Sequence, residues 1–275
     1  MPAPRSPIPS FCQWLCLVSA LAIILTSASC RKGATGVPAG PLVVGMDLSY
    51  PPFETIGADG NPSGVSVDLA RALGSSLHRD VRIENIPFTG LIPSLLTGKI
   101  DLILSSMTDT PERRNTIAFS DPYLTIGLGC LAGKTTGLAS PADLDREGRT
   151  IAVRQGTTAQ AWAMNHVKRA RVLVLDKESS AVLEVIQGKA DAFVYDQMSV
   201  WKNHREHPAE TVSLLQPLQT EHWAAGLRPG DRVLRDQVNA FLRGYRASGG
   251  FDRLGDKYLR EQKEAFAAAG IPFYF

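Results

Sequence analysis

The sequence predicts an α/β protein built from two similar lobes. Strand, glycine-containing turn and helix follow one another in both halves of the 275-residue chain, a pattern that favours parallel sheets over a helical bundle. An internal similarity adds to this, since residues 95–104 are LLTGKIDLIL and residues 185–194 are VIQGKADAFV. Both segments indicate the end of an apolar helix, a Gly-Lys pair, an Asp and a buried strand. Two copies of this unit predict two lobes.

The first copy is preceded by alternating strands and helices. Leu42–Met46 is a short apolar run that predicts a strand, and residues 81–86 predict a second strand by their alternating pattern. Between them, residues 65–77 carry apolar side chains at helical spacing. Leu91–Leu96 predicts a short helix that Gly98 ends, because glycine readily takes the left-handed conformation found after helix C-termini.

The segment 100–123 contains the strongest candidate for ligand binding. Residues 100–104 predict a buried strand, and Thr110-Pro111-Glu112 then has the residues of a helix start: a Thr cap, a Pro at the first helical position and an acid in the first turn. Arg113 therefore lies beside free backbone N–H groups at the carboxyl end of a strand, where open α/β sheets hold ligands. A guanidinium there can bind a carboxylate bidentately. The alternative is an exposed ion-pair residue on a turn.

The second half offers two similar positions. Residues 150–155 predict a strand and Thr158 begins a helix, so Gly156-Thr157 forms a turn that either binds an anion or only caps the helix. Asp196 follows the strand of the second copy. Asp196 could contact a ligand, or it could serve only as the N-cap of a helix beginning QMSVWKNH.

The N-terminus has the layout of a secretory signal peptide over residues 1–29. Arg5 precedes an apolar run of about 15 residues, which is shorter than the 18 to 20 that a membrane-spanning helix needs. Small residues leading to Cys30 resemble the lipobox of bacterial lipoproteins, in which Cys30 would be lipidated. Ser27 departs from that motif, so ordinary cleavage and an uncleaved anchor stay open. Residues 30–41 are small and indicate a flexible tether.

Composition narrows the functional classes. Of the four cysteines, only Cys130 lies beyond the signal and tether, which predicts a fold without an intramolecular disulfide and a Cys130 that is a small buried side chain. A formal charge of +2 predicts no nucleic-acid surface. No metal-ligand cluster, phosphate loop or nucleophile motif is present, so we expect no metal, no cofactor and no catalytic residues.

The motifs in their order resemble a known family. They are similar to family 3 periplasmic solute-binding proteins, the amino-acid receptors of ABC importers, from about residue 42 to residue 258; the motifs are GMDLSYPPFE, GVSVDLARAL, FTGLIPSLLTGKIDLILSSMTDTPERR, FSDPY, RQGTTAQ and GKADAFVYDQ. The resemblance implies a two-lobed periplasmic-binding-protein type II fold, in which two parallel-rich sheets are joined by two crossover strands. It implies a first lobe of residues 42–127 plus 221–275 and a second lobe of residues 128–220.

The resemblance also implies roles for individual residues. Arg113, with the backbone N–H groups of Thr108 and Thr158, would bind the α-carboxylate of an amino acid. Asp196 and the Ser106 carbonyl would bind its α-ammonium. The positions that would surround the ligand's side chain are Asp47, Tyr50, Phe88 and Ser105. The partners implied are an amino acid and the subunits of an ABC permease. The protein is expected to be a monomer outside the cytoplasm, in the periplasm or at the surface of the cell envelope, with a lipid anchor in the membrane.

The ligand expected from these residues is a cationic amino acid. Tyr50 and Phe88 would pack on the methylenes of a long side chain while Asp47 pairs with its charged head. If Asp47 is only a turn residue, a polar uncharged ligand is expected. An enzyme resembling cyclohexadienyl dehydratase, which has this same fold, and a sensory receptor are the alternative functions.

Two segments depart from the family's pattern. Gly64-Val65-Ser66 and Phe88-Thr89-Gly90 are expected to affect local capping more than ligand contact. The tail 261–275 extends beyond the family's usual last helix, and we expect its final aromatic residues, 273–275, to pack on the first lobe.

Overall fold

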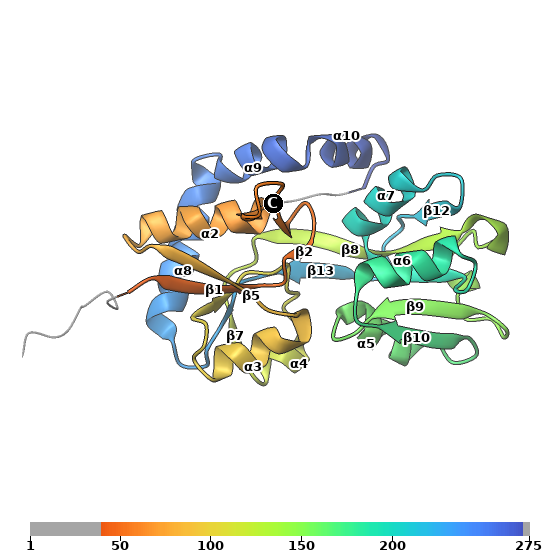
Figure 1. Cartoon of the computed structure of the whole chain (residues 1–275), viewed down its shortest axis with the longest axis horizontal. Helices are drawn as coiled ribbons and strands as arrows, with labels where there is room; N and C mark the ends of the chain where they lie inside the picture. The colour runs from red at the N-terminus through yellow and green to blue at the C-terminus, as the bar shows by residue number, and fades with distance from the viewer. Residues whose placement is uncertain (1–39, 272–275) are drawn as a thin grey trace, which may run out of the picture. The chain divides into compact units, whose positions relative to one another are not determined.

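The structure is a computed structural model that describes residues 40–271 (Figure 1). The predicted signal peptide, the lipidation site Cys30, nearly all of the tether and the aromatic residues 273–275 lie outside the described residues. No helix within residues 40–271 is both long enough and apolar enough to cross a membrane.

The first lobe is organised around a five-stranded sheet. Its order is β5-β1-β6-β14-β7, with β5, β1 and β6 parallel and β14 antiparallel to both of its neighbours. The predicted strands at 42–46 and 81–86 are confirmed, but the strand expected over 100–104 pairs only at two residues. The bounds are β1 Leu42–Met46, β5 Val81–Asn85, β6 Leu102–Ile103, β7 Ala118–Phe119 and β14 Gly226–Leu227.

Helices cover both faces of this sheet (Figure 1). Leu42, Val44 and Met46 of β1 point into one core together with the apolar face of α2. The other face packs on α3 through a second core cluster that includes Leu91 and Leu95. The helices are α2 Val65–Ser76, α3 Leu91–Leu96, α4 Pro111–Arg114, α8 Arg232–Ala247, α9 Gly250–Tyr258 and α10 Arg260–Ala268.

Smaller elements fill the connections. A three-stranded antiparallel sheet follows β1, and three short 3-10 helices lie in loops of the described part of the chain. Their bounds are β2 Ser49–Tyr50, β3 Glu54–Ile56, β4 Pro62–Ser63, η1 Phe88–Gly90, η2 Lys134–Thr136 and η3 Pro141–Asp143.

The second lobe is organised around a mixed sheet of order β10-β9-β11-β8-β12. β10, β9 and β11 are parallel, and β8 runs antiparallel to β11 and β12. Cys130, in the middle of β8, is buried as predicted. The elements are β8 Leu124–Gly133, β9 Thr150–Arg154, β10 Arg171–Leu175, β11 Ala192–Asp196, β12 Thr211–Leu214, α5 Thr158–His166, α6 Glu178–Ile186 and α7 Gln197–Glu206.

Two antiparallel strands run between the sheets. The first half of β8 pairs with β13, Thr220–Trp223, and the second half of β8 belongs to the second sheet. After β13 the chain enters β14 of the first sheet, so β8 and β13 are the two crossover strands (Figure 1). The residue boundaries 42–127 plus 221–275 and 128–220 stay predictions.

The internal repeat has a structural explanation in its Asp. Asp101 exchanges hydrogen bonds with Val43 of β1: the Asp101 N–H donates to the Val43 carbonyl at 2.8 Å, and the Val43 N–H donates to the Asp101 carboxylate at 3.1 Å. Asp191 does the same with Thr150 of β9, at 2.8 and 2.7 Å. In each copy the Asp therefore fixes the start of the neighbouring parallel strand.

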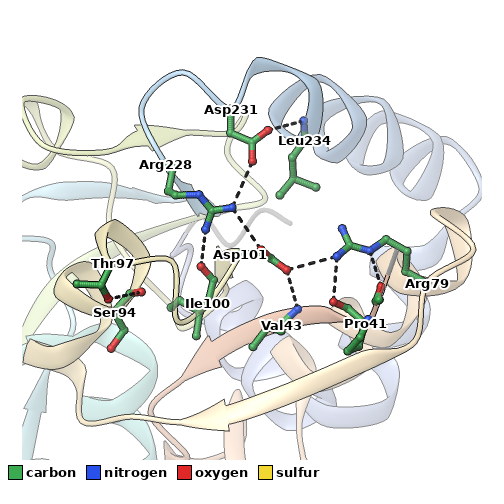
Figure 2. A network of polar contacts seen from close by, with 11 residues as sticks. Pro41, Val43, Arg79, Ser94, Thr97, Ile100, Asp101, Arg228, Asp231 and Leu234 are labelled. Carbon is green, nitrogen blue, oxygen red and sulfur yellow. Dashed lines mark hydrogen bonds and ion pairs between the residues drawn. The ribbon is translucent and has the colours of Figure 1, made fainter. Parts of the chain in front are cut away.

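The first copy adds ion pairs to this arrangement (Figure 2). Asp101 lies between Arg79 and Arg228, with nitrogen to oxygen distances of 3.3 and 3.2 Å. Arg228 also donates to the Ile100 carbonyl at 2.6 Å. Because Arg228 follows β14, these contacts join the returning C-terminal part of the chain to the start of the first sheet.

Candidate functional site

A pocket is lined by residues of both lobes. Elements of the first lobe contribute the ends of β1 and β6, the loop before α4 and the η1 turn, and the second lobe contributes the ends of β9 and β11 and the start of α5. All nine ligand-binding positions expected from the sequence line this pocket; they are Asp47, Tyr50, Phe88, Ser105, Ser106, Thr108, Arg113, Thr158 and Asp196.

Arg113 is held at the pocket by its own helix start. The Thr110 hydroxyl accepts a hydrogen bond from the Arg113 N–H at 3.2 Å, and Pro111 occupies the first helical turn, as predicted. The guanidinium donates to the Thr108 carbonyl at 2.7 Å and to the Gly156 carbonyl of the second lobe at 3.0 Å. A guanidinium has five N–H donors, so these two bonds leave donors for a carboxylate.

Asp196 has the capping role that the sequence offered as an alternative. Its carboxylate accepts a hydrogen bond from the Ser199 N–H at 3.0 Å at the start of α7. Asp196 is only 5% exposed, and burial raises the pKa of its carboxyl to about 7. Tyr50 lines the same pocket, and its buried hydroxyl acts on Asp196 in the opposite sense and lowers this pKa. Asp196 is thus both a helix cap and a pocket carboxyl group.

The Asp47 carboxylate is paired with an arginine that the sequence analysis did not predict as a site residue. Its Oδ2 accepts from the Phe88 N–H at 3.0 Å and pairs with the Arg154 guanidinium, and its Oδ1 accepts from Ser49 at 2.7 Å. Arg154 ends β9 in the other lobe and is only 4% exposed. Burial by itself lowers the pKa of Arg154, but Tyr195 and Asp47 raise it above its ordinary value. Asp47 therefore has a cation beside it before any ligand binds.

Glu54 forms a second buried carboxyl group that was not predicted. It accepts hydrogen bonds from the hydroxyls of Ser66, Ser105 and Ser106 at 2.6, 3.2 and 3.1 Å. Burial raises the pKa of Glu54 to about 8, although these bonds oppose the rise. The segment Gly64-Val65-Ser66, which departs from the family's pattern, therefore contributes a hydrogen bond to a carboxyl group of the pocket through Ser66. Its effect is not limited to helix capping.

Local backbone geometry supports this cluster. Ser106 has a φ of +48°, which is uncommon for a residue other than glycine and is typical of functional turns. Gly64 has a φ of +123°, and a Cβ there would lie 2.4 Å from the Phe53 carbonyl oxygen. Glycine is therefore required two residues before Ser66, whose hydroxyl bonds to Glu54.

Glu221 completes the charged groups of the pocket. It lies on β13, where its carboxylate accepts from the Thr108 hydroxyl and from the Gln219 amide, both at 2.9 Å. Four carboxyl groups line the pocket against two guanidinium groups; the acids are Asp47, Glu54, Asp196 and Glu221, and the bases are Arg113 and Arg154. The remaining lining residues are Leu128, Tyr195, Trp223 and Thr157, which belongs to the turn expected either to bind an anion or to cap a helix and is the N-cap of α5.

The sequence held one signal for the missed residues. Arg154 interrupts an otherwise apolar buried strand, TIAVR, at its carboxyl end, which is the position of ligand contacts in parallel sheets. Glu54 begins the short strand β3 after a Pro-rich segment, and Glu221 lies in the short strand β13; neither position has a local pattern that points to a pocket.

Comparison with known proteins identifies the family. Residues 42–261 match the model of the bacterial extracellular solute-binding proteins, family 3. This chain belongs to that family. Among the relatives of this family 3 protein is the ABC transporter arginine-binding protein 1 of Escherichia coli K12, 29% identical over 219 residues, or 78% of this chain and 89% of the relative. The histidine-binding periplasmic protein of Salmonella typhimurium is 26% identical over 252 residues, or 88% of this chain and 96% of that relative.

Solved structures agree with the family assignment. A putative ABC transporter binding component of Wolinella succinogenes, complexed with lysine, is 32% identical with a TM-score of 0.76, covering 80% of this chain and 96% of that one. An ancestral amino-acid-binding protein, described as a precursor of cyclohexadienyl dehydratase, is 33% identical with a TM-score of 0.74, covering 80% and 95%. The family 3 protein thus has the two-lobed type II fold that its motifs predict.

Proposed function

We propose that this family 3 protein captures a polar amino acid between its lobes and delivers it to an ABC permease. One observation carries the proposal: a guanidinium and a carboxyl group, Arg113 and Asp196, line one pocket from opposite lobes. A zwitterion needs one fixed cation and one fixed anion. The arginine-binding and histidine-binding relatives add support.

In this proposal each end of the amino acid has its own partners. Arg113 and the N–H groups of Thr108 and Thr158 bind the α-carboxylate, while Asp196 and the Ser106 carbonyl bind the α-ammonium. Asp47, Tyr50, Phe88 and Ser105 surround the ligand's side chain. Domain closure over the ligand would complete these contacts, as in other hinged receptors.

Two ligand classes are supported by different observations. Relatives described as binding arginine, histidine or lysine favour a cationic side chain. The ion pair between Asp47 and Arg154 favours a neutral polar side chain. Competition calorimetry separates the two, and tighter binding of glutamate than of both arginine and glutamine would contradict each of them.

A thermal-unfolding screen against the common amino acids tests the proposed function. A ligand at about 100 times its dissociation constant adds about 2.7 kcal/mol to the free energy of unfolding. The enzyme alternative has support in the dehydratase precursor among the similar structures and in the protonatable Asp196. Turnover of prephenate or arogenate, with no amino acid raising the melting temperature, would favour that alternative.

We also propose that the mature protein is a monomeric lipoprotein, held at the cell envelope by a lipid on Cys30. The motif before Cys30 and the periplasmic location of relatives support this. Mass spectrometry of the N-terminal peptide from the membrane fraction is expected to find a lipidated Cys30. Cys30→Ala should move the protein out of that fraction, and an unchanged distribution would contradict the anchor.

A further inference from the structure

We propose that Arg154 determines the charge of the ligand's side chain: by holding Asp47 it makes that end of the pocket neutral, so an amide such as glutamine binds in preference to a cationic amino acid. The proposal rests on the proposed function above and names the ligand class for the same site. Three observations support it: the contacts that hold the pair of Asp47 and Arg154, the hydrogen-bonding groups that this pair leaves unused, and the other charged groups near it.

The ion pair is built from both lobes. Arg154 lies at the end of β9 in the second lobe and Asp47 follows β1 in the first, 107 positions apart in the chain. Their side chains are 5% and 11% exposed. Arg154 is held by two further contacts within its own lobe, to the Tyr195 hydroxyl at 3.2 Å and the Asp176 carbonyl at 3.3 Å. The guanidinium is therefore fixed in the position where a cationic ligand head would pair with Asp47.

The hydrogen-bonding groups left on the pair match a primary amide. Three contacts engage Arg154, at Nε, Nη1 and Nη2, and a guanidinium has five N–H donors, so two donors remain. Asp47 accepts from Phe88, Arg154 and Ser49, and a carboxylate has about four acceptor sites, so one remains. An amide offers one carbonyl oxygen and an NH₂ group, which can use both kinds of site. A second guanidinium or an ammonium can use only the acceptor.

Two other carboxyl groups of the pocket are already hydrogen-bonded within the protein. Glu54 is bonded to three serines, and Glu221 to Thr108 and Gln219. A cationic head at Asp47 would therefore meet the like charge of Arg154 in a buried site, or would have to displace it. The Phe88 ring also has guanidinium carbons of both Arg113 and Arg154 5.6 Å from its centroid, so protein cations already use its face.

Titration calorimetry with glutamine, citrulline and arginine tests the proposal. Citrulline and arginine have nearly the same shape and differ in charge, so their comparison in the unchanged protein needs no mutation. We expect the better of the two neutral ligands to bind about tenfold or more tightly than arginine. Arg154→Gln should shift the ratio toward arginine by about tenfold, because Asp47 is then available to a ligand cation.

Two further variants control the experiment. Arg171→Gln makes the same chemical change at an exposed position of β10 in the same lobe and should leave the ratio unchanged. Arg154→Lys keeps the positive charge and should still disfavour arginine. The neutral ligands should bind it less tightly, because an ammonium does not have the forked donors of a guanidinium. If Arg154→Gln does not fold, as circular dichroism would reveal, the unchanged protein and Arg154→Lys decide the question.

Two results would overturn the inference. One is arginine binding more tightly than both neutral ligands to the unchanged protein. The other is a folded Arg154→Gln variant whose ratio stays within about twofold of the original. If no amino acid binds the unchanged protein, the proposed function itself fails, which is a distinct result.

Discussion

Arg113 is the residue on which capture of an α-carboxylate depends in this account. Arg113→Ala should leave the protein folded and weaken binding by about 3 kcal/mol or more, roughly a hundredfold, because a closed site loses a charged bidentate contact. Arg113→Lys should recover little, since an ammonium cannot reproduce the fork. Arg114→Ala is the matched control, as that side chain is 60% exposed, pairs with Asp109 and does not line the pocket. Near-normal affinity of Arg113→Ala in calorimetry would remove Arg113 from the site.

Asp196 should make ligand affinity depend on pH. The ligand's ammonium requires the ionised carboxylate, but burial raises the pKa of Asp196 to about 7 in the free protein. Below about pH 7 a proton therefore competes with the ligand, and affinity should fall by up to about tenfold per pH unit. Asp196→Asn should bind weakly and lose this slope. If Asp196→Asn is only less stable and binds normally, helix capping is the sole role of this residue.

Residues with a local signature could be predicted, and those defined by distant partners could not. Arg113 follows a Thr-Pro-Glu helix start and Asp196 follows a buried strand before a helix, so each position is visible within a few residues. The partnership of Asp47 and Arg154 depends on how two lobes meet, and no local pattern contains it. For the same reason the expectation of a cationic ligand was drawn without Arg154, and it stays a prediction.

At the scale of elements, the repeated Asp of the Gly-Lys motif is expected to stabilise both sheets. Asp191→Ala should lower the free energy of unfolding by about 1–3 kcal/mol, because the Thr150 N–H loses its carboxylate acceptor. Asp101→Ala should cost about 3 kcal/mol, because the largely buried Arg79 also loses its carboxylate partner and keeps only the Gly40 and Pro41 carbonyls. Urea unfolding measures both. Asp236→Ala, 71% exposed on α8, is the control, and equal effects in all three variants would contradict this role.

Most elements were predictable because their signals are local. The helix of Leu91–Leu96 ends before Gly98, whose φ is +77°, as the glycine rule requires. The strand expected over residues 100–104 is shorter because the chain leaves the sheet to form the turn at Ser106. That turn depends on Glu54, which is 52 positions away from Ser106.

For the whole molecule, the raised pKa values predict that the ligand-free protein loses stability as pH rises. Glu54 has an ordinary pKa of 4.5 and a folded value of about 8, and Asp196 changes from 3.8 to about 7. Each group favours the protonated folded state, so its stabilisation is complete below the ordinary pKa and is lost as pH rises through the folded value. The free energy of unfolding should therefore fall between about pH 5 and 8, by at most about 1.4 kcal/mol per pH unit for each group.

Urea unfolding at several pH values checks this trend. Glu54→Gln keeps a neutral side chain of similar shape at every pH, so it should flatten the curve. A stability that is constant or that rises from pH 5 to 8 would mean that Glu54 and Asp196 are not held protonated in the folded protein.

The central claim is that one pocket binds both charged ends of an amino acid. The most direct measurement is calorimetric titration of the purified protein with its best amino-acid ligand and with two derivatives, the amine that lacks the α-carboxylate and the N-acetyl form that lacks the α-ammonium. The account predicts one amino acid bound per chain, and a loss of about a hundredfold or more in affinity for each derivative. Equal binding of either derivative, or no binding of any amino acid, would contradict it.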